Sequence, residues 1–126
     1  MRFLRPLCLA GLTLALAMSA GCSKSASYYM AHGKDLYAKK DYKGAIVDFR
    51  NAIAREPRLG EGHRQLADAY LAIGDLRDGI KEYIRAADVR PDDVALQIKA
   101  GQYLLLAGQS QDAKARADAV LQKDPA

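Results

Sequence analysis

Cysteine and histidine are the residue types in this 126-residue chain that could bind a metal or act as nucleophiles. Cys8 and Cys22 both lie within the first 22 residues, so they offer no disulfide framework for a folded domain. His32 and His63 are far apart and have no Cys or His neighbour at ligand spacing. We therefore expect no metal site and no cofactor. We interpret His32 as a core residue and His63 as a helix-packing residue.

Composition also argues against catalysis and nucleic-acid binding. Half of the residues are apolar and 27% are charged, as in an ordinary globular protein. Without Arg2 and Arg5, 17 basic residues face 15 acidic ones, too small an excess to indicate nucleic acid. Gly74 and Gly108 fall at breaks between helical segments and form no phosphate-binding loop. The sequence predicts a protein that is not an enzyme.

Cys22 is the residue for which the sequence does indicate chemistry. Arg2 and Arg5 precede the apolar run Leu7–Ala20, and small residues follow it. This is the layout of a secretory signal, and the run is shorter than the ~20 residues that a membrane-spanning helix needs. An uncleaved membrane anchor is the alternative.

The segment Ser19-Ala20-Gly21-Cys22 resembles a bacterial lipobox. The resemblance implies that residues 1–21 are a lipoprotein signal peptide and that Cys22 becomes an acylated N-terminus. Two or more acyl chains, such as palmitate, anchor a protein stably. Ser23 resembles the signal for outer-membrane sorting, so we expect a lipid-anchored envelope protein that faces the periplasm. Residues 22–27 form a short linker that reaches less than ~18 Å. A chance cysteine after a signal peptide is the alternative.

Three prolines at 34-residue intervals organise the remaining chain: Pro57, Pro91 and Pro125. A period of this length, carried by helical patterns, indicates a stacked repeat. The units are residues 26–59, 60–93 and 94–126, and each divides into two helical segments. The breaks are Lys40-Asp41, Gly74-Asp75 and Gly108-Gln109. Glycine suits the left-handed residue that ends a helix, and Asp75 can cap the next helix.

Small residues recur where the two helices of a unit are expected to cross closely. They are Gly33, Ala67 and Gly101 at the eighth position of the units, and Ala45, Gly79 and Ala113 at the twentieth. Larger residues, among them Phe49, Tyr70 and Tyr83, are expected to fill the layer around each crossing. Unit three has Ala117 where Phe49 and Tyr83 stand, so it is expected to be the loosest.

These positions are where the chain resembles the tetratricopeptide repeat family, over residues 26–126. The resemblance implies an all-α fold, a right-handed superhelical array of three helix-turn-helix units with about six helices. It also implies a concave groove, lined by the first helix of each unit, that binds protein segments. The groove positions are Ser27, Met30, Lys34, Tyr37, Glu61, Arg64, Asp68, Leu71, Ala95, Ile98, Gln102 and Leu105.

One subclass of the family clamps the C-terminal carboxylate of heat-shock chaperones with Lys and Asn residues. Here Met30, Lys34 and Ala95 depart from that pattern, and only Lys99 could serve. We therefore do not expect a chaperone-tail clamp.

The ends of the array suggest two further contacts. The third unit is very apolar, and we expect the end at Leu104–Leu106 to dock a protein partner or to mediate self-association. An array truncated from a longer one is the alternative. Residues 23–59, the first unit with part of the linker, carry eight basic and four acidic residues, so these lysines could face anionic lipid or glycan, or form an ordinary solvated face.

The predicted function is a membrane-anchored scaffold for protein–protein interactions in the bacterial envelope. The stretches DYKGAIVDFRNAIAREP and LADAYLAIGDLRDGIKEY are similar to lipoproteins linked to exopolysaccharide and exosortase-type surface-protein sorting systems. Broader relatives assemble pili or outer-membrane proteins. A purely structural element of a larger complex is a further possibility.

Overall fold

A computed structural model describes residues 23–123 and 125, which form six α-helices and no strand. The helices are α1 (Ala26–Ala38), α2 (Tyr42–Arg55), α3 (Gly60–Ala72), α4 (Leu76–Val89), α5 (Val94–Leu106) and α6 (Ser110–Lys123). None of them is long and apolar enough to cross a membrane. The predicted signal peptide (1–21) and Cys22 lie outside the described residues.

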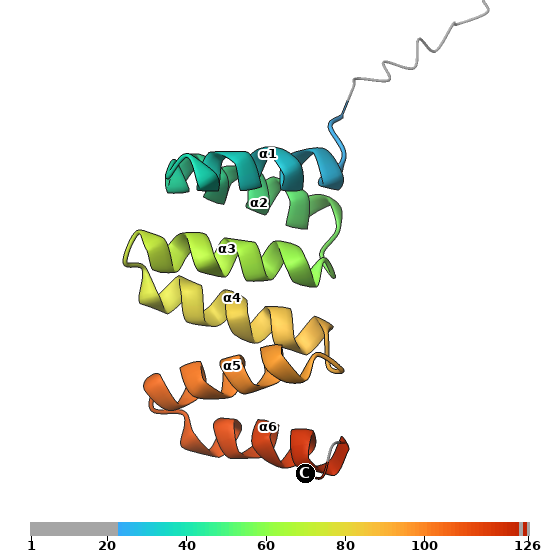
Figure 1. The fold of residues 1–126 in the computed structure, drawn as a ribbon, viewed down its shortest axis with the longest axis vertical. Coiled ribbons are helices and arrows are strands. Elements are labelled where there is room, and N and C mark those ends of the chain that lie inside the picture. Colours follow the sequence, from blue (N-terminus) through green and yellow to red (C-terminus); the bar gives the residue numbers. More distant parts are fainter. Residues whose placement is uncertain (1–22, 124, 126) are drawn as a thin grey trace, which may run out of the picture.

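The six helices stack in chain order into a single column (Figure 1). Helices α1 and α2, α3 and α4, and α5 and α6 pack as pairs, and α2–α3 and α4–α5 contacts join the pairs. Among these helices, those of the first pair do not touch those of the third. The predicted array of three helix-turn-helix units is confirmed, with each unit packed only on its neighbours, as in a solenoid.

The turn inside each unit has a left-handed residue at the predicted break. The φ angles are 62° at Lys40, 83° at Gly74 and 77° at Gly108. Asp75 then caps α4 by accepting a hydrogen bond from the backbone N–H of Asp78 at 3.1 Å, as predicted. Asp41 caps α2 in the same way.

The core consists of two apolar clusters between neighbouring units. The first joins α1, α2 and α3 around Phe49, which is fully buried. The second joins α3, α4 and α5 around Tyr83. Of the predicted packing residues, Gly33, Ala45, Phe49, Ala67, Gly79, Tyr83 and Ala113 are buried, and Tyr70 and Gly101 are half-buried. A Cβ on Gly79 would lie 3.3 Å from the carbonyl oxygen of Ala67, so these two small residues do meet where α3 and α4 cross.

The prediction of a core position for His32 is wrong. Its side chain is exposed, hydrogen-bonds to the Asp48 carboxylate and stacks on Tyr28. The equivalent residues Leu66 and Ala100 are buried because α3 and α5 pack on a preceding unit. Among the described residues no unit precedes α1, so the side chain at the same repeat position, His32, faces solvent.

The third unit is the least buried, as predicted. Helix α6 buries Ala113 alone, whereas α2 and α4 bury five residues each. Ala117 is too small to fill the layer that Phe49 and Tyr83 fill in the other units.

Candidate functional site

Helices α1, α3 and α5 share one side of the array, which we call the first-helix face. An ion pair crosses this face between units: Nζ of Lys34 on α1 lies 3.3 Å from Oε1 of Glu61 on α3. The resemblance predicts that this side is concave. The pair joins the first two units across it.

Arg64 organises the middle of the first-helix face. It donates two hydrogen bonds to the Glu61 carboxylate, at 2.9 Å each, and a third to Asp68 at 3.1 Å. Hydrogen bonds from Arg64 lower the pKa of Glu61 to about 2, outweighing its partial burial, with help from Gln65 and Lys34. Glu61 is therefore ionised throughout the neutral range, and its charge is already paired.

Asp68 is surrounded by tyrosines. The Tyr83 hydroxyl donates a hydrogen bond to the Asp68 carboxylate. Burial raises the pKa of Tyr37 and of Tyr103, and the negative charge of Asp68 raises both further. Burial and the bond to Asp68 raise the pKa of Tyr83 more strongly. All three phenols therefore stay neutral, and the Tyr83 hydrogen bond joins the Asp68 carboxylate to an aromatic ring.

Tyr103 and Lys99 extend this cluster onto α5. The Tyr83 and Tyr103 ring centroids are 4.9 Å apart, and Nζ of Lys99 lies 5.2 Å from the centroid of Tyr83. Asp68 already bonds to Arg64 and Tyr83, and Lys99 lies over the Tyr83 ring, so the cluster combines paired charges with aromatic rings.

The predicted groove residues differ in their surroundings. Lys34, Glu61, Arg64 and Asp68 form the ion-pair network of the first-helix face. Tyr37 packs against the first core cluster and Leu71 against the second, and Ser27 and Ala95 are exposed. Met30 is buried in the first core cluster and offers almost no surface to a ligand. Ile98, Gln102 and Leu105 are exposed on α5, and they line a different cavity.

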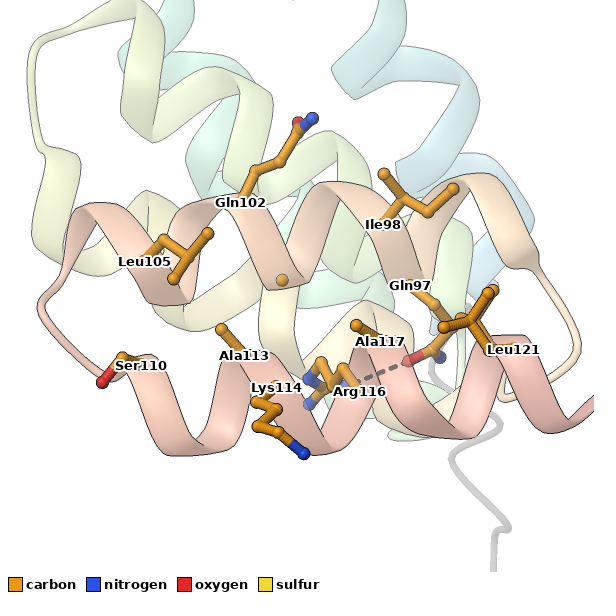
Figure 2. A pocket seen from close by; sticks show the side chains of 12 residues that line it. Gln97, Ile98, Gln102, Leu105, Ser110, Ala113, Lys114, Arg116, Ala117 and Leu121 are labelled. Carbon is orange, nitrogen blue, oxygen red and sulfur yellow. Dashed lines mark hydrogen bonds between the residues drawn. The ribbon is translucent and has the colours of Figure 1, made fainter.

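This second cavity lies between α5 and α6 and measures about 470 Å³. Figure 2 shows Leu105 and Ile98 on α5 facing Ala113 and Ala117 on α6 across it. The lining is Gln97, Ile98, Gly101, Gln102, Leu105, Ser110, Ala113, Lys114, Arg116, Ala117, Val120 and Leu121. We call it the terminal groove. The exposed surface in it is almost entirely apolar.

The predicted docking end at Leu104–Leu106 needs correction. Leu104 is only 3% exposed, whereas Leu105 is 59% and Leu106 is 68% exposed. Successive residues of an α-helix point about 100° apart, so three in a row cannot share one exposed face. Of the three, only Leu105 lines the terminal groove.

Sequence reasoning missed the polar link between the last two units. Arg116 on α6 donates to Oε1 of Gln97 at 2.8 Å and to Asp88 on α4 at 2.5 Å (Figure 2 shows the first bond). Gln97 in turn donates to the carbonyl oxygen of Ala87 at 2.6 Å. A polar residue at the fourth position, where Tyr29 stands in unit one, is the signal that could have indicated a buried network.

Within residues 23–123 and 125, no group of three His, Cys, Asp or Glu side chains is arranged to hold a metal ion. Every buried side-chain nitrogen or oxygen in that part has a hydrogen-bond partner. The described surfaces offer paired charges, aromatic rings and exposed apolar side chains.

Stacked helix pairs with a 34-residue period and a polar first-helix face define a helical-repeat solenoid. Residues 36–102, more than half of the chain, match the model of the family described as tetratricopeptide repeat. The chain belongs to the tetratricopeptide repeat family.

Solved structures share this fold at low sequence identity. The MamA protein matches with a TM-score of 0.66 and 20% identity, over 80% of this chain and 55% of that one. The second TPR of Spaghetti (RPAP3), bound to the HSP90 peptide SRMEEVD, matches with a TM-score of 0.63 and 20% identity, over 79% of this chain and 92% of that one. The Yersinia enterocolitica type III secretion chaperone SycD, in complex with a YopD peptide, matches with a TM-score of 0.61 and 16% identity. The match covers 76% of this chain and 73% of that one.

The chain thus spans about half the length of MamA. A comparison with curated proteins finds no matching sequence.

Proposed function

We propose that this protein is a non-enzymatic scaffold that binds a protein segment on its first-helix face. The observation that carries the proposal is the Asp68 carboxylate, which accepts a hydrogen bond from Tyr83, whose ring centroid lies 4.9 Å from that of Tyr103. The fold supports it, because similarly folded chains are seen with the peptides of HSP90 and YopD.

We propose that the segment places a basic side chain at Asp68. Lys34 and Arg64 are paired with Glu61 and Asp68, so these four charges balance, and a cation of the ligand would share the Asp68 carboxylate with Arg64. A Lys or Arg of the ligand there would gain a charge-assisted hydrogen bond and contact with the rings. A chaperone-tail clamp uses several cations, whereas Lys99 adds a single one beside Tyr83, so the clamp fits this face less well.

The proposal includes attachment to the bacterial envelope through acylated Cys22, with the domain held near the outer membrane on the periplasmic side. The short linker would keep the first unit close to lipid. Within the envelope, we propose a role in exopolysaccharide or surface-protein export, or in assembly of pili or outer-membrane proteins.

Binding of anionic lipid by the first unit is the weaker alternative. Two of its lysines are already paired with carboxylates, Lys34 with Glu61 and Lys39 with Asp35. Pairing reduces the free positive charge that would attract a membrane surface.

Photo-crosslinking in living cells tests the scaffold function. A benzophenone amino acid replaces Lys34, which is exposed on α1 and reaches Glu61 across the first-helix face, or Val47, which is exposed on α2. We expect a specific crosslinked partner from position 34 and not from position 47. Asp68→Asn should abolish that crosslink while preserving the acceptor for Tyr83. Equal crosslinking from both positions, or no effect of Asp68→Asn, would contradict the proposal.

Metabolic labelling with an alkyne fatty acid tests the anchor separately. The chain should take up label and partition with membranes, and Cys22→Ala should lose both properties. Labelling of Cys22→Ala would show that the fatty acid is attached elsewhere.

A further inference from the structure

The terminal groove exists because two positions in unit three are both small. In unit one, Gly33 lies against Phe49: a Cβ on Gly33 would be only 2.7 Å from Cε1 of that ring. In unit two the same pair of positions holds Ala67 and Tyr83, both buried. In unit three the same two positions hold Gly101 and Ala117. Within 4 Å, a Cβ on Gly101 would meet only the carbonyl oxygen of Ala113, at 3.9 Å.

No side chain of unit three therefore takes the place of the aromatic ring. The space is open to solvent and forms part of the cavity of about 470 Å³ between α5 and α6. Figure 2 shows Ala113 and Ala117 pointing from α6 toward α5. The hollow has the size and apolar lining to accept an aromatic side chain from outside.

The equivalent faces of the other two units are each covered by a helix. Helix α3 covers unit one, where its Leu66 and Ala69 join the cluster around Phe49. Helix α5 covers unit two, where its Leu96 and Ala100 join the cluster around Tyr83. The terminal groove is the same surface one repeat later, so its shape is that of a seat for a helix.

The molecule also shows that a second copy does not fit this seat head to tail. The helix that such a copy would present is α1, with Tyr28, His32 and Asp35 at the positions that meet the preceding unit. All three are exposed, and His32 is paired with Asp48. Placing this polar surface against an apolar groove would remove water from charged groups without supplying new partners.

We propose that the terminal groove binds an amphipathic α-helix of a partner protein, with an aromatic side chain of that helix inserted between Gly101 and Ala117. The inserted ring supplies from outside what Phe49 and Tyr83 supply within their own units. The inference deepens the proposed scaffold function, but it concerns a surface separate from the Asp68 cluster.

The test uses a peptide with the sequence of residues 91–107, because α5 already binds the equivalent face of unit two. Its residues corresponding to Ile98 and Gln102 are replaced by a hydrocarbon cross-link on the exposed side, since a short free helix is marginal in water. One version keeps Ala100 and the other carries Ala100→Phe, which directs a ring toward the hollow. Fluorescence anisotropy measures binding of each labelled peptide to the purified full chain.

We expect the phenylalanine peptide to bind at least about tenfold more tightly than the alanine peptide. In the chain, Ala117→Phe should fill the hollow from within and weaken binding of the phenylalanine peptide by at least about tenfold, with an unchanged or higher melting temperature. Leu105→Ala and Leu106→Ala are a matched pair, because both side chains are exposed and only Leu105 lines the groove. Only Leu105→Ala should weaken binding.

Equal binding of the two peptides, or undiminished binding to Ala117→Phe, would overturn the inference. If Ala117→Phe does not fold, Leu105→Lys replaces it, since an exposed residue tolerates a charge. A concentration-dependent dimer that Leu105→Lys dissociates, seen by sedimentation velocity, would assign the groove to a second copy and also overturn it. Asp68→Asn should leave peptide binding intact, so failure of the first-helix face and failure of the terminal groove are distinguishable.

Discussion

Nδ1 of His63 lies 2.6 Å from Oε2 of Glu82, and Nε2 of the same ring lies 2.9 Å from the carbonyl oxygen of Pro57. A carboxylate and a carbonyl only accept hydrogen bonds, so both ring nitrogens must donate. This geometry suits a doubly protonated His63, buried on α3 and paired with Glu82 on α4, and the bond to Glu82 raises the pKa of the ring. Arg85 donates to the other oxygen of Glu82 at 2.8 Å. The pair ties both helices of unit two to the turn that follows unit one.

This pair predicts a maximum of stability at mildly acidic pH. The hydrogen bond to Glu82 raises the pKa of His63 above its ordinary 6.5, so this stabilisation is complete below pH 6.5 and is lost as pH rises through the raised value. Burial opposes ionisation of Glu82, but the bond from His63 and the charge of Arg85 outweigh it and lower its pKa below 4.5. Its contribution is complete above pH 4.5 and is lost as pH falls further.

Urea denaturation at a series of pH values measures this effect. The free energy of unfolding should be highest between pH 4.5 and 6.5 and should fall on either side. His63→Gln should remove the fall above pH 6.5, whereas His32→Gln, at the exposed histidine, should keep it. An unchanged alkaline slope in His63→Gln would show that other groups carry the pH dependence.

Gly33 and Gly101 occupy the same repeat position in different surroundings. A Cβ on Gly33 would lie 2.7 Å from the ring of Phe49, which is fully buried and cannot move aside. Gly33→Val should therefore destabilise the protein by about 1–3 kcal/mol through overpacking. Gly101→Ala should be neutral or stabilising by up to about 1 kcal/mol, because alanine favours helix and the site is open. Thermal melts of both variants check this, and equal losses would contradict the assigned crowding.

Lys40 holds a conformation that the other units give to glycine. Its φ is 62°, against 83° at Gly74 and 77° at Gly108. A side chain in the left-handed region costs about 1–2 kcal/mol, so Lys40→Gly should stabilise the protein by about 1 kcal/mol once the greater freedom of unfolded glycine is included. Gly74→Ala should have the opposite sign. Chemical denaturation measures both changes, and a loss of stability in Lys40→Gly would show that the lysine side chain contributes something further.

The sequence predicted the fold because local and periodic features determine it. Glycine and aspartate at the unit breaks specify a left-handed residue and an N-cap, and these are the features seen at Gly74 and Asp75. Small residues 34 apart specify close crossings, and Ala67 and Gly79 meet as predicted. These relations depend on residue type and spacing alone.

The details of the site depend on which neighbours are present. The repeat register predicts a core position for His32, but no described unit lies beyond α1 to cover it. The apolar end predicts an exposed Leu104, yet the turn of the helix buries this side chain. The His63–Glu82 pair and the tyrosines around Asp68 join side chains from different helices, and a spacing within one helix does not reveal such contacts.

Arg116 provides the last prediction, because it fastens α6 to the rest of the array. Its guanidinium bonds to Gln97 and to Asp88, so Arg116→Met should leave the buried amide oxygen of Gln97 without a donor. A buried unsatisfied group costs about 1–3 kcal/mol, and this cost should fall on unit three. Lys114→Met is the matched control: Lys114 pairs with Asp118 on an exposed surface, where such pairs contribute about 0–1 kcal/mol. Hydrogen exchange read by mass spectrometry should show faster exchange in α5 and α6 of Arg116→Met and little change in α1–α3. Uniformly faster exchange through all six helices would mean that the array unfolds as one cooperative unit, and that Arg116 does not act locally.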